Sequence, residues 1–117
     1  MKKILVADDE MAIRLLYSEE LKEEGYEVYT ASNGKEALEI VEKVPLDLVI
    51  LDIKMPVMDG IEALRQIKER YPHLPVVLST AYGEYKQDFA TWASDEYLVK
   101  SSDLEDLRAT VKRYLKD

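Results

Sequence analysis

The chain alternates between short, almost entirely hydrophobic runs and longer segments in which hydrophobic residues recur every three or four positions. Runs of the first kind are typical of strands that are buried on both faces, and the second pattern is typical of amphipathic helices. Their alternation predicts a parallel sheet covered by helices on both faces. We expect the strands at residues 3–7, 27–31, 46–51, 76–79 and 96–99.

Four of the intervening or following segments carry a hydrophobic stripe of helical period, and Gly25 is placed to end the first helix. The stripe residues are Ile13, Leu16, Tyr17 and Leu21; Ala37, Leu38 and Val41; Ile61, Leu64 and Ile67; and Leu104, Leu107, Val111 and Leu115. Residues 102–105 match a capping box ahead of the last helix, and residues 83–93 predict a short or irregular helix. The simplest topology is therefore five β-strand/α-helix units in one open, doubly wound α/β sheet, forming a single domain over residues 1–117 without an effector domain.

Composition narrows the classes of function. The chain has 117 residues, of which 47% are hydrophobic, and this is enough for one core. The formal net charge of -8 disfavours direct nucleic-acid binding, because the phosphate backbone carries the same sign. The absence of cysteine excludes disulfides and thiolate metal sites and fits the reducing cytoplasm. The first apolar run is too short for a signal peptide, and no stretch approaches the ~20 apolar residues of a membrane span. We therefore expect a cytoplasmic protein without membrane insertion.

Polar side chains follow four of the predicted strands. Asp8 and Asp9 follow the first strand, Asp52 the third, Thr80 the fourth and Lys100 the fifth. Ligands of doubly wound sheets bind beyond the carboxyl ends of the strands. We therefore expect these five side chains to meet at one opening.

The chemistry of these residues favours a site that handles phosphate. Three carboxylates in one cleft repel one another unless a cation or protons offset their charge, and oxygen ligands suit Mg²⁺ better than zinc. Lys100 offers a mobile positive charge and Thr80 a hydroxyl donor, both useful against phosphoryl oxygens. Asp52 is then the candidate nucleophile, which would form an acyl phosphate. The backbone carbonyl of Lys54, in a loop stiffened by Pro56, is a candidate for a further metal ligand.

Four segments, at residues 4–10, 52–60, 78–81 and 97–100, occur in an order and at a spacing that make the whole chain resemble the receiver domains of two-component response regulators. The resemblance implies a flavodoxin-like (βα)5 fold. It also implies phosphoryl transfer to Asp52 from a phosphohistidine on a sensor histidine kinase or a histidine phosphotransfer protein. Phosphorylation would switch a surface that docks a downstream protein target, and the chain resembles single-domain phosphorelay or chemotaxis-type regulators.

The resemblance further implies the ligands of the metal. Mg²⁺ would be bound by Asp9, Asp52 and the Lys54 carbonyl, with Asp8 acting through water. These assignments place three acids and one loop carbonyl around a single cation.

The resemblance assigns the remaining site residues to the phosphoryl group and the switch. Thr80 and the Ala81 amide would contact the phosphoryl group, and Lys100 would form an ion pair with it. Tyr97 would be the switch aromatic, whose ring moves inward when the threonine hydroxyl moves toward phosphate. The protein would be a signalling phosphoacceptor that catalyses only its own phosphorylation and dephosphorylation, and not an enzyme acting on separate substrates.

The sequence departs from the family pattern in two places. Lys100 precedes Ser101 where most relatives have proline, and a cis bond without proline costs about 3 kcal/mol, so we predict a trans peptide there. The stretch from Thr80 to Lys100 is slightly shorter than usual, so the helix within it must be shortened or displaced. The family's usual output surface therefore does not transfer to this chain.

Other functions remain open at this point. An aspartyl-phosphate phosphatase usually needs a second acid two residues after the nucleophile, where this chain has Lys54. A flavin-binding domain would need a phosphate cradle after the first strand, where Asp8 and Asp9 would repel phosphate. A pseudo-receiver that serves only as an interaction module would keep the fold without the transfer. Met11 and Leu15 lie off the main helical stripe near the acidic edge, either as a docking patch for the phosphodonor or as ordinary exposed residues.

Overall fold

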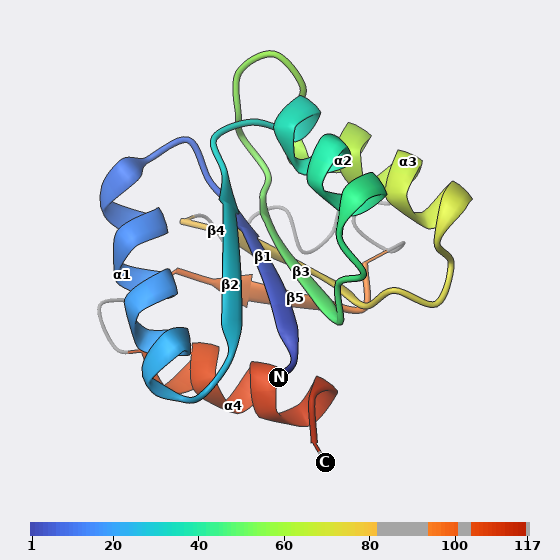
Figure 1. Ribbon diagram of the computed structural model, residues 1–117. Helices are drawn as coiled ribbons and strands as arrows, with labels where there is room; N and C mark the ends of the chain where they lie inside the picture. Colours follow the sequence, from blue (N-terminus) through green and yellow to red (C-terminus); the bar gives the residue numbers. More distant parts are fainter. Residues whose placement is uncertain (82–93, 101–103, 117) are drawn as a thin grey trace.

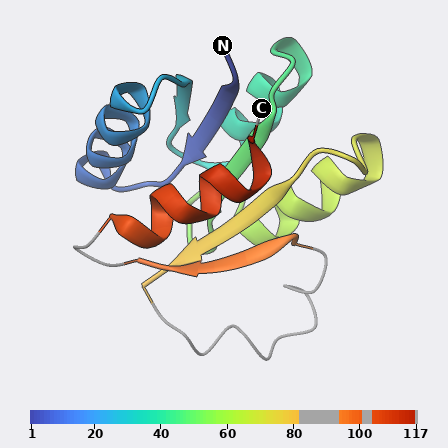
Figure 2. The same cartoon turned by 90° about the horizontal axis from the view of Figure 1, so that it is seen from below.

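The computed structural model describes residues 1–81, 94–100 and 104–116 (Figure 1). Within them, five parallel strands form one sheet in the order β2-β1-β3-β4-β5, as expected for a doubly wound fold. Figure 2 shows β4 and β5 side by side at one edge of the sheet. The elements are β1 (Lys3–Ala7), α1 (Met11–Glu23), β2 (Glu27–Ala31), α2 (Gly34–Lys43), β3 (Leu48–Asp52), α3 (Gly60–Arg70), β4 (Val76–Thr80), β5 (Glu96–Val99) and α4 (Glu105–Tyr114).

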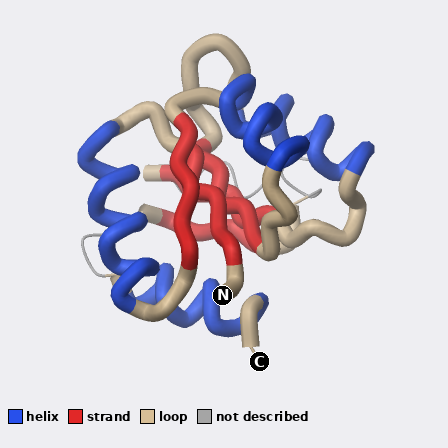
Figure 3. Tube along the Cα trace, in the orientation of Figure 1, coloured by secondary structure: helices blue, strands red, loops and turns tan. Residues whose placement is uncertain are grey.

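Helices cover both faces of the sheet, which separates two hydrophobic clusters (Figure 3). Leu5 packs with α2 and α3 on one face, and its neighbour Ile4 packs with α1 and α4 on the other. Both side chains are fully buried, because successive residues of a strand point to opposite faces. This two-sided burial explains why the strands are continuous hydrophobic runs and not alternating ones.

Three strands have the bounds predicted from the sequence, and two differ at their ends. β3 begins at Leu48 instead of residue 46, because Asp47 is already engaged with Lys3: its carboxylate accepts from the Lys3 amide at 2.8 Å. β3 and β4 each extend one residue further, to Asp52 and Thr80, because the ladder continues through the Asp52–Ser79 pair and the Thr80–Val99 pair. Two predicted site residues are therefore the last residues of their strands.

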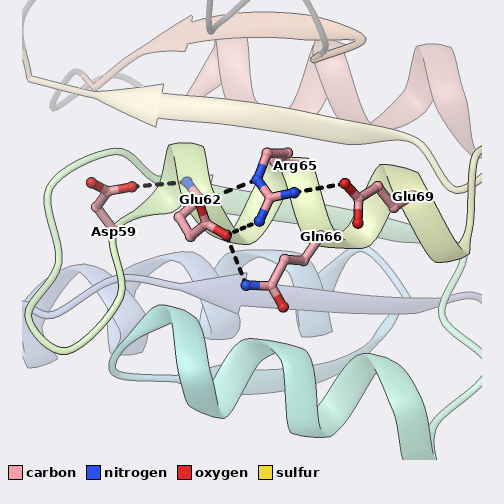
Figure 4. Close-up of polar contacts among 5 residues, drawn as sticks. All are labelled: Asp59, Glu62, Arg65, Gln66 and Glu69. Atoms are coloured by element: carbon pink, nitrogen blue, oxygen red, sulfur yellow. Dashed lines mark hydrogen bonds and ion pairs between the residues drawn. The ribbon is translucent and has the colours of Figure 1, made fainter.

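The helix ends follow local rules that the sequence carries. Gly25 has a φ of 97°, and its amide and that of Tyr26 donate to the carbonyls of Lys22 and Leu21 at 3.0 and 3.1 Å, so the predicted end of α1 is confirmed. Asp59 caps α3 by accepting from the Glu62 amide at 2.8 Å (Figure 4). Figure 4 also shows Glu62, Arg65, Gln66 and Glu69 linked along the exposed side of α3.

The predicted helical stripes are buried or partly buried with one exception. Leu16 is 41% exposed, so its place in the stripe of α1 was wrong: it lies beside Leu15 on the solvent side, while Tyr17 and Leu21 fill the core. The helix predicted at residues 83–93, the Ser102 end of the capping box and the Lys100–Ser101 peptide lie outside the described residues. In the part that is described, no helix has the length and apolar character needed to cross a membrane.

Candidate functional site

A polar pocket of about 190 Å³ opens at the carboxyl edge of the sheet. Asp52 and Thr80 reach it from the last positions of β3 and β4. Lys100 directly follows β5, and its amide donates to the Thr80 carbonyl at 2.7 Å. The residues that line the pocket are Asp9, Glu10, Asp52, Lys54, Thr80, Ala81 and Lys100.

Asp8 does not line this pocket, but it is buried beside it and shares Lys100 with Asp52. The Lys100 ammonium is 2.5 Å from Asp8 Oδ2 and 3.3 Å from Asp52 Oδ1. The side chains of Asp8, Asp52 and Lys100 are only 3%, 8% and 11% exposed. Burial works against the charged form of Lys100, but the two carboxylates outweigh it and raise the pKa of the ammonium. One cation thus holds two buried acids together.

One positive charge does not fully compensate the acids. Burial, followed by the charge of Asp8, raises the pKa of Asp52 to about 6, and Lys100 offsets only part of that shift. The Asp52 carboxylate is therefore charged at neutral pH at a cost in free energy. An additional cation beside it would relieve this cost.

The β1–α1 loop presents the oxygens that such a cation would need. Carboxylate oxygens of Asp8, Asp9 and Glu10 lie within 4.8 Å of one another. The Glu10 amide donates to Asp8 Oδ1 at 2.9 Å and fixes that carboxylate, whereas Asp9 and Glu10 are exposed. Hard oxygen donors without histidine or cysteine fit Mg²⁺, so the residues present are suited to that metal.

The β3–α3 loop, which carries Lys54, is held tightly against the acceptor strand. The Gly60 amide donates to the Ile53 carbonyl at 2.8 Å, and the Gly34 amide of α2 donates to the Met58 carbonyl at 2.9 Å. An ideal Cβ at Gly60 would lie 2.0 Å from the Asp52 carbonyl oxygen, so only glycine permits this approach. The loop therefore fixes the position of the Lys54 backbone relative to Asp52.

Val57 forms the tip of the same loop in a conformation that is unusual for a β-branched residue. Its φ is 68°, and the Met58 amide donates to the Pro56 carbonyl at 2.7 Å across it, which closes a three-residue γ-turn. Val57 is 77% exposed, so little packing offsets the strain.

Sequence reasoning missed three residues that bear on the pocket. Glu10 lines it, and Arg14 contacts the Asp8 carbonyl at 2.7 Å. Tyr17 was placed only in the core, but its phenol senses the charges of the site: burial raises its pKa, while Ser79 and Lys100 offset part of the shift. A tyrosine in a core stripe needs a polar partner, and that was the available sign for Tyr17. Tyr97 is half-buried and packs against the core on the α2/α3 face.

Comparison with known proteins identifies the family and confirms the fold. The sequence profile of the response regulator receiver domain matches residues 4–112. The chain belongs to this family. The receiver domain is 41% identical over 116 residues to sporulation initiation phosphotransferase F of Bacillus subtilis, covering 97% of this chain and 94% of that protein. It is 35% identical to the regulatory protein AtoC of Escherichia coli, of which it spans only 25%.

Solved structures agree with this assignment. The receiver domain superposes on the response regulator TrrA of Thermotoga maritima, in complex with Mg(2+)-BeF, with a TM-score of 0.95 and 49% identity over 98% of this chain and 100% of that one. It also matches a chain in the complex of the histidine kinase ThkA with TrrA, with a TM-score of 0.93 and 48% identity over 99% of this chain and 100% of that one. The predicted flavodoxin-like receiver fold is confirmed, and the protein is a receiver of two-component signal transduction.

Proposed function

We propose that this receiver domain accepts a phosphoryl group on the carboxylate of Asp52 in the presence of Mg²⁺. The observation that carries the proposal is the buried cluster in which Asp52 shares the Lys100 ammonium with Asp8 and has its pKa raised to about 6. Such a carboxylate gains from any cation or electrophile that enters the pocket. Neither a phosphatase nor a flavin-binding function has comparable support.

The chain's own residues supply the parts of the transfer. An oxygen of Asp52 attacks phosphorus, and the bond from phosphorus to the donor histidine nitrogen breaks, leaving its electron pair on that nitrogen. Lys100 pairs with the incoming charge, and the Thr80 hydroxyl and the Ala81 amide donate to phosphoryl oxygens from the wall of the pocket. Asp8, Asp9, Asp52 and the Lys54 carbonyl would hold Mg²⁺, which supplies further positive charge to the same oxygens when it is bound.

The phosphodonor in this proposal is a phosphohistidine on a sensor kinase or phosphotransfer protein. The complex of ThkA with the similar TrrA supports a histidine kinase as partner. Met11, Leu15 and Leu16 are 64%, 53% and 41% exposed along α1 next to the pocket, and we propose them as the apolar part of the docking surface. Output would pass through Thr80 and Tyr97 to a downstream protein, with the receiver acting in the cytoplasm as a phosphoprotein and on no separate substrate.

The test is labelling by a small phosphodonor. We expect the full chain, incubated with acetyl phosphate and Mg²⁺, to gain the mass of one phosphoryl group, and Asp52→Asn to gain none. Asp59→Asn is the matched control, because Asp59 caps α3 outside the pocket and asparagine caps helices equally well. Intact-mass spectrometry gives the result directly.

Two results would contradict the proposal. Labelling that persists in Asp52→Asn would place the nucleophile elsewhere. Absence of labelling in the unaltered chain, with either acetyl phosphate or a phosphorylated kinase domain as donor, would favour the pseudo-receiver alternative.

A further inference from the structure

Arg14, in the first turns of α1, reaches back to the loop that carries the acids. Its Nη1 donates to the Asp8 carbonyl oxygen at 2.7 Å, while its own amide donates to the Glu10 carbonyl at 3.1 Å. The Asp8 carbonyl belongs to the peptide that joins Asp8 to Asp9, so this contact restrains the peptide between the two acids. Arg14 itself is half-buried.

The positive charge of the same side chain also acts on Glu36, in the first turn of α2. Glu36 Oε1 accepts from the Ser32 amide at 2.8 Å and from the Ser32 hydroxyl at 2.9 Å. These two contacts lower the pKa of Glu36, and the nearby Arg14 guanidinium lowers it further. Arg14 thus has a backbone partner in the β1–α1 loop and lies near the Glu36 carboxylate in the first turn of α2.

We propose that Arg14 is a positioning residue for the metal-binding acids of this receiver domain. The inference rests on the proposed Mg²⁺ site and adds a residue to it. Four contacts fix Asp8: its amide donates to the Ala31 carbonyl at 3.0 Å, its Oδ1 accepts from the Glu10 amide, its Oδ2 pairs with Lys100, and its carbonyl accepts from Arg14. The exposed Asp9 carboxylate has no such set of contacts among the described residues, so its direction depends on the peptide that Arg14 holds.

Positioning and charge repulsion predict opposite changes in Mg²⁺ affinity when Arg14 is removed. A guanidinium close to an acidic site repels a divalent cation, so its removal would strengthen Mg²⁺ binding if the arginine did nothing else. Its removal would weaken binding if the arginine fixes the ligands, because outer groups that orient metal ligands contribute to affinity. The sign of the change therefore separates positioning from simple electrostatics.

The experiment is calorimetric titration of Mg²⁺ into the folded, unphosphorylated full chain. We expect Arg14→Met to weaken Mg²⁺ binding about tenfold. Arg14→Lys, which keeps the charge and one donor, should fall between Arg14→Met and the unaltered chain. Arg108→Met is the matched control, because Arg108 of α4 pairs with Glu20 of α1, the helix that carries Arg14, and is 32% exposed, yet lies outside the pocket. Its Mg²⁺ affinity should not change.

Unchanged or tighter Mg²⁺ binding by Arg14→Met overturns the inference. If circular dichroism shows that Arg14→Met does not fold, the Mg²⁺ affinity of Arg14→Lys is compared with that of Arg108→Lys instead. Weaker binding by Arg14→Lys supports positioning, and equal or tighter binding refutes it. A chain that binds no Mg²⁺ at all would contradict the proposed function itself. Binding by the unaltered chain without an effect of Arg14 would remove only this inference.

Discussion

Asp52 carries a charge that the folded protein disfavours. Its pKa is raised from 3.8 to about 6, first by burial and then by Asp8. The folded state therefore holds a proton on this carboxyl more tightly than the unfolded chain does. As pH rises from about 4 through 6, the unfolded chain releases that proton first, and the folded state loses stability.

This raised pKa leads to a prediction for Asp52→Asn. At pH 7.5 without metal, the variant should have a free energy of unfolding up to about 3 kcal/mol higher than the unaltered chain, because a shift of about two pKa units, which already includes the pairing with Lys100, is worth nearly 3 kcal/mol. Near pH 4.5 the advantage should fall to about a third of that value, because the unfolded chain has already released most of its proton there while the folded chain has not. Urea denaturation in chelator at both values measures it, and an equal difference at the two pH values would show that the carboxyl is not perturbed.

The sequence predicted the site residues that directly follow a predicted strand. Asp8, Asp52 and Lys100 follow hydrophobic runs, so their convergence could be inferred from topology alone. Arg14 could not be found in this way, because an arginine on the polar side of an amphipathic helix has no distinctive spacing. Its partner is a backbone carbonyl, which no sequence pattern records.

At the level of elements, the γ-turn at Val57 is a local cost inside the loop that carries Lys54. A sparsely populated backbone conformation with positive φ costs an ordinary residue about 1–3 kcal/mol, and it is least favourable for a β-branched residue such as valine. Val57→Asn should therefore raise the free energy of unfolding by about 1 kcal/mol, because the exposed valine side chain contributes little packing. Chemical denaturation measures the change.

The control for this prediction is Val57→Ala. Alanine keeps a Cβ and loses only the β-branch, so its gain should be smaller than that of asparagine. A loss of stability in Val57→Asn would mean that the valine side chain makes a contribution that its exposure conceals.

Strand and helix boundaries were less predictable than the existence of the elements. The start of β3 depends on Asp47 meeting Lys3, a contact between residues far apart in the sequence. The last residues of β3 and β4 are polar, and a polar residue after a hydrophobic run predicts that the strand has already ended. Only the pairing with the neighbouring strands shows that both strands continue by one residue. Leu16 was misplaced because three adjacent apolar residues on α1 fit the stripe equally well, and only the packing of Tyr17 selects among them.

For the molecule as a whole, the proposed Mg²⁺ site at the carboxyl edge would link folding to metal binding. Mg²⁺ that binds only the folded state stabilises it by about 1.4 kcal/mol when its free concentration is tenfold above the dissociation constant. For a chain of 117 residues this corresponds to a rise of about 5 °C in the melting temperature. Thermal unfolding followed by circular dichroism across a Mg²⁺ series should show this rise.

Asp9→Asn provides the comparison for the metal effect. This substitution removes the negative charge of one exposed carboxylate among the proposed metal ligands and leaves the core untouched. Mg²⁺ should therefore raise the melting temperature of the variant less at every concentration. The same rise in both proteins would indicate that Mg²⁺ acts by general screening of the net charge of -8.

The two glycines at the helix starts set a limit on how this pocket could be moved into another scaffold. A side chain at Gly34 would meet the Met58 carbonyl at 2.4 Å, just as one at Gly60 would meet that of Asp52. Grafting the acids, the lysine and the threonine onto a different α/β protein would thus reproduce the charges but not their spacing. A transplanted site would also need glycine at the two corresponding positions, which a list of the reactive side chains does not include.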